Sequence, residues 1–356
     1  MYRAALVGCS RMGAFIDNEV PVERAPYSHA AGYEACERTE MVACSDTRPE
    51  VMERVGERYG VPVEKQYTDY REMIDWEQPD IVSVATQPEQ RAEIVVYAAE
   101  HGAKAIYAEK AMAASMSDAD AMVEAVERNN VLFHLGTNRR WDVGYDAMVE
   151  VIESGRIGKL KSVVSHTTGT LFNTASHIFD LLMRLNGDHP ASWVQTYFPN
   201  GDELIEGDRL TKDPTGEGTI QFANGVMAYA LNSGRGLEVE AIGEKGAVTA
   251  LGTDREWRIR EEGEKDYRGR SVWVDGEFPP VERGSSTLRL IEDLVDGLES
   301  GEATRCDVRL ARANQELIFA FVESHVRGGK RIELPLEGST FRLERDWKAN
   351  EPRFER

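Results

Sequence analysis

The chain has 356 residues, of which 41% are hydrophobic and 29% are charged, as in globular proteins. This length exceeds what one hydrophobic core usually serves, so we expect two domains. The formal net charge of -20 opposes binding to nucleic acid or to an anionic membrane, and we expect neither partner. No segment approaches the roughly 18 consecutive apolar residues of a membrane span, and the N-terminus reaches a glycine turn too early for a signal peptide. We therefore expect a cytoplasmic protein that binds a small polar metabolite.

Short apolar runs alternate with amphipathic stretches in the first part of the chain. The runs are too continuously apolar for half-exposed antiparallel strands, and they predict buried parallel strands at residues 3–7, 41–45, 81–85, 105–108 and 131–135. Residues 49–59 and 89–100 carry the start and stop signals of helices. The pattern predicts an α/β fold whose N-terminal part, residues 1–136, is a doubly wound Rossmann domain.

The pattern changes after residue 136. A helix is predicted at residues 142–154, and alternating runs predict strands at 160–166, 219–222, 226–231 and 331–334. Asn224-Gly225 is a strong hairpin signal between the second and third of these strands. Two more helices are predicted at residues 287–299 and 308–326. We therefore expect a C-terminal α+β domain over residues 137–356, built on an open, mostly antiparallel mixed sheet.

A glycine-containing turn follows the first predicted strand and leads into the start of a helix. In this context the glycines allow a tight turn and close helix packing, and the helix amides face a pyrophosphate. Serine replaces the usual middle glycine and offers a hydroxyl to a phosphate. The alternative is a structural turn that holds no cofactor. The candidate cofactor residues of the turn are Gly8, Ser10, Arg11, Met12 and Gly13.

Asp46 follows the second predicted strand, where an acid would bind the adenosine ribose hydroxyls. Asp46 lies further along the chain than expected, because roughly 20 residues normally separate the glycine turn from this acid. We interpret residues 17–28, which contain two prolines, as an inserted loop that lies either near the active site or only on the surface. Asp46 would repel a ribose 2′-phosphate and favours NAD, whereas Arg48 would accept one and leaves NADP as the less favoured cofactor.

Several segments of the chain resemble the Gfo/Idh/MocA family of sugar and polyol oxidoreductases, which includes glucose-fructose oxidoreductase and inositol dehydrogenase. Residues 85–88 (A-T-Q-P) are similar to the family's A-T-P-P, and residues 109–111 (E-K-A) to its E-K-P. Residues 136–141 resemble the segment that joins the domains, and residues 173–180 resemble the motif D-x-x-x-H-x-x-D. The chain departs from the family pattern at Gln87, Arg91, Ala111 and Asn173.

The resemblance implies a Rossmann domain and an α/β domain whose free sheet face makes a homodimer or homotetramer. It also implies NAD as cofactor and a carbohydrate substrate. Lys110 is expected to hold the substrate hydroxyl and stabilise negative charge, while His177 exchanges the proton. Further cofactor contacts are expected from Thr86, Gln87, Pro88, Glu109 and Arg48. Further substrate contacts are expected from Asn138, Arg140, Asn173 and Asp180.

Each of these side chains also has a structural interpretation. A lysine at a strand end is often only solvated, and His177 could be a hydrogen-bonded residue at a helix start. Glu109 either orients Lys110 or contacts the nicotinamide ribose. Asp180 either holds a substrate hydroxyl or caps local backbone. Asn138 and Arg140 either line the pocket or clamp the domains together.

Three classes of function follow. The first is NAD-dependent hydride transfer to or from a secondary alcohol or ketone of a sugar, sugar derivative or cyclitol. The second is a glycoside-cleaving enzyme or lyase that oxidises the sugar transiently, with no net redox change. The third is a non-catalytic nucleotide-binding or sugar-binding sensor. The histidines and the four cysteines show no metal-ligand spacing, so we expect no metal and plain thiols.

Overall fold

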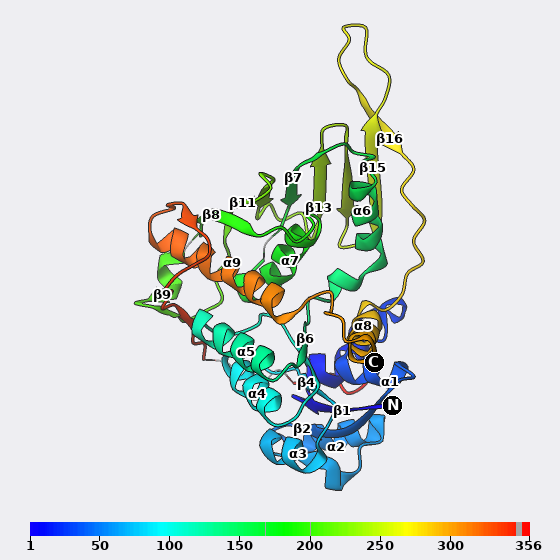
Figure 1. Ribbon diagram of the computed structural model, residues 1–356, viewed down its shortest axis with the longest axis vertical. Helices are drawn as coiled ribbons and strands as arrows, with labels where there is room; N and C mark the ends of the chain where they lie inside the picture. Colours follow the sequence, from blue (N-terminus) through cyan, green and yellow to red (C-terminus); the bar gives the residue numbers. More distant parts are fainter. Residues whose placement is uncertain (168, 200, 347–350) are drawn as a thin grey trace. The chain divides into compact units, whose positions relative to one another are not determined.

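The computed structural model describes residues 1–167, 169–199, 201–346 and 351–356 of the chain, which forms two units (Figure 1). Unit 1 consists of Met1–Trp141, Arg283–Arg312 and Asp346–Arg356. Unit 2 consists of Asp142–Glu282 and Ala313–Arg345. The chain therefore leaves unit 1 after residue 141 and returns to it twice.

Unit 1 is built on a six-stranded sheet in the order β3-β2-β1-β4-β5-β6, with every neighbouring pair parallel. This is the doubly wound order of a Rossmann domain, as the sequence predicts. The strands are β1 Tyr2–Val7, β2 Thr39–Ser45, β3 Gln66–Tyr67, β4 Ile81–Val84, β5 Ala105–Ala108 and β6 Leu132–Leu135. The five strands predicted from apolar runs are confirmed to within two residues at each end, whereas β3 is too short to show a pattern.

Helices cover the sheet because successive residues of a strand face opposite sides. In β1, Val7 belongs to one apolar cluster and Leu6 to the other. Helix α2 occupies its predicted range and ends at Gly60, which has the left-handed φ of 73° that favours glycine. The helices of this part of the chain are α1 His29–Ala35, α2 Pro49–Tyr59, α3 Tyr70–Glu77, α4 Pro88–Glu100 and α5 Met116–Arg128.

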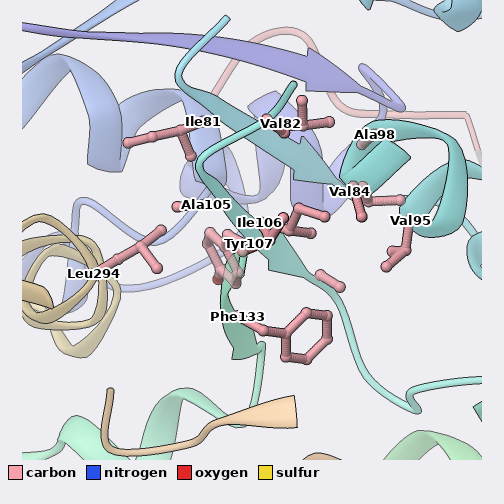
Figure 2. Packing of buried hydrophobic residues seen from close by; sticks show 14 of the residues in the cluster. Ile81, Val82, Val84, Val95, Ala98, Ala105, Ile106, Tyr107, Phe133 and Leu294 are labelled. Carbon is pink, nitrogen blue, oxygen red and sulfur yellow. The ribbon is translucent and has the colours of Figure 1, made fainter. Parts of the chain in front are cut away.

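Helix α8 (Ser286–Ser300) also belongs to unit 1, although it is far from the sheet in sequence. Its side chains Leu290, Ile291 and Leu294 are fully buried in the same cluster as the central strands, and Figure 2 shows Leu294 near Ala105. A Cβ on Gly32 of α1 would lie 2.6 Å from Ile291 Cδ1, so the two helices pack closely.

The predicted C-terminal domain over residues 137–356 therefore needs correction, because residues 137–141, 283–312 and 346–356 are part of unit 1. The physical reason is that the apolar face of α8 completes the core of the first unit. A polar contact also fixes the helix: Asp293 lies 3.0 Å from Nε2 of the buried His134 on β6 and accepts a 3.1 Å hydrogen bond from Trp141 Nε1. The helix pattern in the sequence gives no sign of which unit the helix joins.

Unit 2 contains a nine-stranded sheet in the order β16-β15-β14-β13-β7-β12-β11-β8-β17. Strands β7 and β12 pair in parallel and the other neighbours pair antiparallel, which confirms a mostly antiparallel mixed sheet. The strands are β7 Leu160–Ser165, β8 Ala191–Tyr197, β11 Glu217–Phe222, β12 Met227–Ala230, β13 Val239–Gly243, β14 Gly246–Leu251, β15 Glu256–Glu262, β16 Trp273–Gly276 and β17 Ile332–Glu333. Strands β9 (Ile205–Glu206), β10 (Arg209–Leu210) and β18 (Arg342–Leu343) form a second, small sheet.

Two helices of unit 2 pack on its large sheet: α6 (Val143–Glu153) on β14 and α7 (Ser176–Arg184) on β7. A Cβ on Gly144 of α6 would lie 2.0 Å from the Trp257 ring, so only glycine allows this approach. Helix α9 (Val308–Val326) has its predicted bounds and contributes residues to both units. Within the described part of the chain, no helix is long and apolar enough to cross a membrane.

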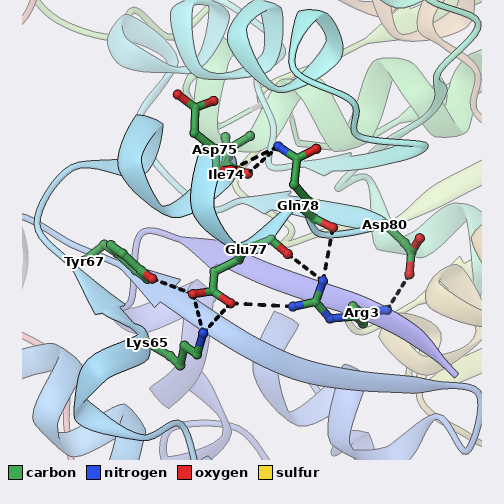
Figure 3. Close-up of polar contacts among 8 residues, drawn as sticks. All are labelled: Arg3, Lys65, Tyr67, Ile74, Asp75, Glu77, Gln78 and Asp80. Atoms are coloured by element: carbon green, nitrogen blue, oxygen red, sulfur yellow. Dashed lines mark hydrogen bonds and ion pairs between the residues drawn. The ribbon is translucent and has the colours of Figure 1, made fainter.

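A buried carboxylate anchors the edge of the parallel sheet next to β3. Figure 3 shows Lys65, Tyr67 and Arg3 converging on Glu77, the last residue of α3. Lys65 Nζ lies 2.7 Å from Glu77 Oε1, and Arg3 Nη2 lies 3.5 Å from Oε2. Burial alone would raise the pKa of Glu77, but the hydrogen bonds from Lys65 and Tyr67 and the charges of Lys65 and Arg3 hold it below its ordinary value.

We expect Glu77→Gln to lower the free energy of unfolding by about 2 kcal/mol at pH 7, because two cations lose a nearly buried partner. The folded-state pKa of Glu77 is depressed, so its contribution is present above the unfolded pKa of about 4.3 and is lost as pH falls through the folded pKa. Urea unfolding at pH 7 and at pH 4 measures this. The exposed Glu72 of the same helix is the control, and an equal effect of Glu72→Gln would contradict the assignment.

Candidate functional site

The turn after β1 is shaped by two glycines. Gly8 has a φ of 92°, and a Cβ there would lie 3.0 Å from the carbonyl atoms of Ala85. A Cβ on Gly13 would lie 1.9 Å from the Gly8 carbonyl oxygen, a distance that no side chain tolerates. The backbone therefore forms the cradle that a pyrophosphate needs, which supports a bound dinucleotide over a purely structural turn.

The remaining residues of the turn lead into a five-residue π-helical segment, Arg11–Phe15. The carbonyl of the half-buried Ser10 accepts a 2.9 Å hydrogen bond from the amide of Ala14. Met12 is half-buried, whereas Arg11 is exposed. The Arg11 guanidinium lies 2.8 Å from a carboxylate oxygen of Glu19 in the inserted loop, so a cation beside the phosphate position already has an anionic partner.

Asp46 has two roles at the end of β2. One carboxylate oxygen accepts the backbone amide of Cys9 at 2.9 Å, which ties the acid directly to the turn. The other accepts the backbone amide and Nε of Arg48, both at 3.1 Å. A carboxylate oxygen can accept more than one hydrogen bond, so Asp46 remains suited to ribose hydroxyls. Arg48 is held by Asp46, the same acid that would repel a ribose 2′-phosphate. This arrangement favours NAD over NADP.

The segment after β4 contains three predicted cofactor residues. Thr86 and Gln87 are half-buried, and Pro88 is the buried first residue of α4. A Cβ on Gly8 would lie 3.3 Å from Thr86 Cγ2, so this segment lies directly against the glycine turn. Thr86 thus lies against the cradle, and the contacts of all three residues with the cofactor stay a prediction.

Arg91 is a site residue whose role sequence reasoning missed. Its side chain on α4 is 1% exposed, which is rare for an arginine. The guanidinium donates to the carbonyl oxygens of Thr86 and Ala111. It therefore ties the segment after β4 to the segment after β5. The sequence shows that Arg91 stands where the family has histidine. It does not show the contact with Ala111, because that contact joins helix α4 to a loop 20 residues later in the chain.

Glu109 lies at the carboxyl end of β5 and is nearly fully buried. His29, the first residue of α1, places Nε2 3.2 Å from Glu109 Oε1 and Nδ1 2.6 Å from Ser83 Oγ. The imidazole also stacks on Tyr107, with ring centroids 3.8 Å apart. Burial alone would raise the pKa of Glu109, but the hydrogen bond and charge of His29, with the charges of Lys110 and Arg91, hold the pKa below its ordinary value. His29 was absent from the predicted site.

Lys110 follows Glu109 and is half-buried. Its backbone amide donates to Glu109 Oε2 at 3.2 Å, so both oxygens of that carboxylate have partners. The Lys110–Ala111 peptide bond is cis. The carboxyl ends of parallel strands are where α/β sheets bind ligands, and Lys110 occupies such a position beside the segment of Thr86.

Asn138 and Arg140 lie in a short 3-10 helix, Asn138–Trp141, and both are buried in unit 1. Arg140 donates a 3.4 Å hydrogen bond to the carbonyl of Arg305. This contact fixes the helix to the segment after α8. It favours a structural contribution of Arg140, while its predicted contact with substrate stays a prediction.

The second predicted motif lies in unit 2. Asn173 is exposed in the π-helical segment Leu171–Ala175, and His177 is half-buried in the first turn of α7. Asp180 is three residues further along α7, on the same face as His177, and is 1% exposed. Asn314 of α9 donates to the carbonyl of Ser176 at 2.8 Å, which fixes this turn.

Asp213 is a second residue that the sequence did not single out. Its carboxylate accepts the backbone amides of Phe172 at 2.9 Å and of Asn173 at 3.0 Å. Burial raises the pKa of Asp213, although these amide hydrogen bonds partly oppose the shift. Asp213 thus anchors the turn that precedes His177. No spacing rule connects it to the motif, because it lies about 40 residues later in the chain.

Within the described residues, no three His, Cys, Asp or Glu side chains gather in a group that could hold a metal ion. The predicted site residues fall into two sets. Unit 1 contains the turn residues, Asp46, Arg48, Thr86, Gln87, Pro88, Glu109, Lys110, Asn138 and Arg140. Asn173, His177 and Asp180 belong to unit 2.

Two known relatives and one solved structure illustrate the similarity. The myo-inositol 2-dehydrogenase of Thermotoga maritima is 24% identical over 269 residues, which cover 70% of this chain and 75% of that protein. The inositol 2-dehydrogenase of Salmonella typhimurium is 27% identical over 222 residues, which cover 58% of this chain and 65% of that protein. The structure of an aldose-aldose oxidoreductase from Caulobacter crescentus matches with a TM-score of 0.74 at 18% identity, covering 94% of this chain and 99% of that one, which supports the fold.

Family models cover most of the chain. The model described as an oxidoreductase family with an NAD-binding Rossmann fold matches residues 3–137. The model described as the C-terminal alpha/beta domain of that oxidoreductase family matches residues 149–334. The chain therefore belongs to the Gfo/Idh/MocA family of oxidoreductases, whose Rossmann domain binds NAD.

Proposed function

We propose that this oxidoreductase transfers hydride between NAD and a secondary alcohol or ketone of a sugar, sugar derivative or cyclitol. The observation that carries the proposal is Lys110, which directly follows the buried Glu109 at the carboxyl end of β5 in an NAD-binding fold. The inositol dehydrogenases among its relatives support a polyhydroxylated substrate.

In the proposed reaction, the ammonium group of Lys110 donates a hydrogen bond to the substrate oxygen and stabilises negative charge that develops there. His177 accepts the hydroxyl proton in the oxidative direction and returns it in reduction, because an imidazole titrates near neutral pH. The glycine turn and Asp46 would hold NAD, which would supply a hydride acceptor for the carbon that bears this oxygen. The substrate thereby becomes a carbonyl compound.

We assign supporting roles to the neighbouring residues. Glu109 positions Lys110, because one of its oxygens accepts the Lys110 amide and the other is held by His29. Arg91 fixes the carbonyl of Ala111 on the other side of the lysine. Asn138, Asn173 and Asp180 are proposed to contact substrate hydroxyls.

We also propose a cytoplasmic homodimer or homotetramer that forms through the large sheet of unit 2. Strand β8 alternates buried residues with more exposed ones, and its outward Tyr197 is 62% exposed. An aromatic side chain on a sheet face is typical of a contact surface. Size-exclusion chromatography with light scattering measures the oligomeric state, and a monomer at micromolar concentration would contradict this proposal.

We expect Lys110→Ala and His177→Ala each to lower kcat by about 100-fold or more, because each removes a group that handles charge or a proton at the reacting oxygen. The measurement is NADH formation with a panel of cyclitols and aldoses, starting with an inositol. Lys104→Ala is the matched control, since Lys104 precedes the same strand and pairs with Asp80 on the surface.

Near-normal turnover in both site variants would reject the catalytic assignment. Product formation by the unmodified protein without accumulated NADH would instead favour the glycoside-cleaving or lyase reaction. Cofactor binding without any product from the panel would favour the sensor.

A second experiment separates the two roles considered for Glu109. We expect Glu109→Gln to lower kcat about tenfold and to leave the Kd for NAD within about twofold, because both carboxylate oxygens already contact His29 and the Lys110 amide. Steady-state kinetics and calorimetric titration with NAD measure the two quantities. A weakened NAD affinity with unchanged kcat would show that Glu109 acts on the cofactor and not through Lys110.

A further inference from the structure

The inserted loop, residues 17–28, closes on itself through one buried carboxylate. Asp17 is 6% exposed and accepts the backbone amides of Tyr27 at 2.6 Å and Ser28 at 3.0 Å. Ser28 then caps α1, whose first residue is His29. The loop therefore has a defined conformation between the phosphate-binding turn and the histidine that contacts Glu109.

The C-terminal segment, residues 351–356, packs on the start of this loop. The Phe354 ring meets the Phe15 ring edge-on, with centroids 4.9 Å apart. Phe354 is half-buried against the apolar cluster that contains Cys9, Ala14 and the 1% exposed Phe15. Phe15 ends the π-helical segment that follows Ser10. The C-terminal segment thus packs on an apolar cluster to which the phosphate-binding turn contributes Cys9.

Polar contacts hold the same segment to the loop. Asn18 donates to the carbonyl of Arg353 at 2.6 Å and accepts from Arg58 of α2 at 3.1 Å. Arg356 donates to the carbonyl oxygens of Asp17 at 3.3 Å and Val20 at 3.2 Å. The Asp17 carbonyl lies in the short helix Ile16–Asn18, whose last carbonyls need external donors, and the Val20 carbonyl lies in the loop that follows this helix. The Arg356 side chain supplies a donor to each of these two carbonyls from at least 336 residues later in the chain.

We propose that residues 351–356 act as a strap that positions the phosphate-binding turn for NAD, with Phe354 as the main positioning residue. The amides of the turn must be ordered before they can bind a pyrophosphate, and a turn that is already ordered loses less entropy on binding. The strap orders it by covering Phe15 and by holding the loop that leaves the turn. This role concerns the binding of NAD alone and does not depend on the substrate or on Lys110.

The test is the Kd of the full chain for NAD, measured by calorimetry without substrate, together with the melting temperature of the apoprotein. We expect deletion of residues 351–356 and Phe354→Ala each to weaken NAD binding by about tenfold or more, with little change in melting temperature. Phe354→Leu keeps an apolar side chain and is expected to restore most of the affinity. Arg353→Ala is the matched control, because Arg353 contacts the loop only through its backbone carbonyl and its side chain is exposed.

A deletion variant that binds NAD within twofold of the unmodified protein would overturn the proposal. A melting temperature that falls in step with NAD affinity in every variant would assign the segment to folding alone and would overturn it as well. An equal loss of affinity in Arg353→Ala would show that Phe354 has no special part in positioning the turn. Loss of turnover in Lys110→Ala with intact NAD binding leaves the strap unaffected, so the two assignments fail separately.

Discussion

The buried carboxylate of Glu109 is the constraint on which the unit 1 site depends. An ionised carboxylate inside a protein requires partners for its oxygens, and Glu109 takes them from His29 and from the backbone of Lys110. A Cβ on Gly136 would lie 2.9 Å from Glu109 Oε1, so a larger residue in the segment after β6 would displace this carboxylate. One side chain thus fixes α1, the end of β5 and the segment after β6 relative to one another.

This constraint gives the inserted loop a function in the architecture. The loop separates the phosphate-binding turn from α1, yet His29 at the start of that helix still reaches Glu109. The Asp17 carboxylate makes this possible, because it joins the beginning of the loop to the two residues before His29. The two ends of the loop are therefore held together, and the hydrogen bond between His29 and Glu109 is kept.

The sequence was sufficient for features that depend on local pattern. Strands β4 and β5 are buried along their whole length and are nearly continuous apolar runs in the sequence, and helix α2 carries proline at its start and glycine after its end. Gly8, Gly13 and Asp46 were located from their spacing after the first two strands, whereas Lys110 was located from the resemblance of residues 109–111 to the family's segment. Contacts between segments that are distant in the chain have no corresponding pattern in the sequence. The packing of α8 in unit 1, the burial of Arg91 and the contact of His29 with Glu109 depend on tertiary structure, which no periodicity records.

At two positions where the chain departs from the family pattern, a side chain from another element is hydrogen-bonded to the backbone. Ala111 stands where the family has proline, and Asn173 stands where it has an acid. In each case a charged side chain from another element holds the local backbone: Arg91 donates to the carbonyl of Ala111, and Asp213 accepts the amide of Asn173. Charge-assisted hydrogen bonds to backbone are stronger than neutral ones, so each of these contacts holds its backbone segment firmly. The side chains at 111 and 173 have therefore changed, while the backbone that presents Lys110 and His177 is anchored from outside each motif.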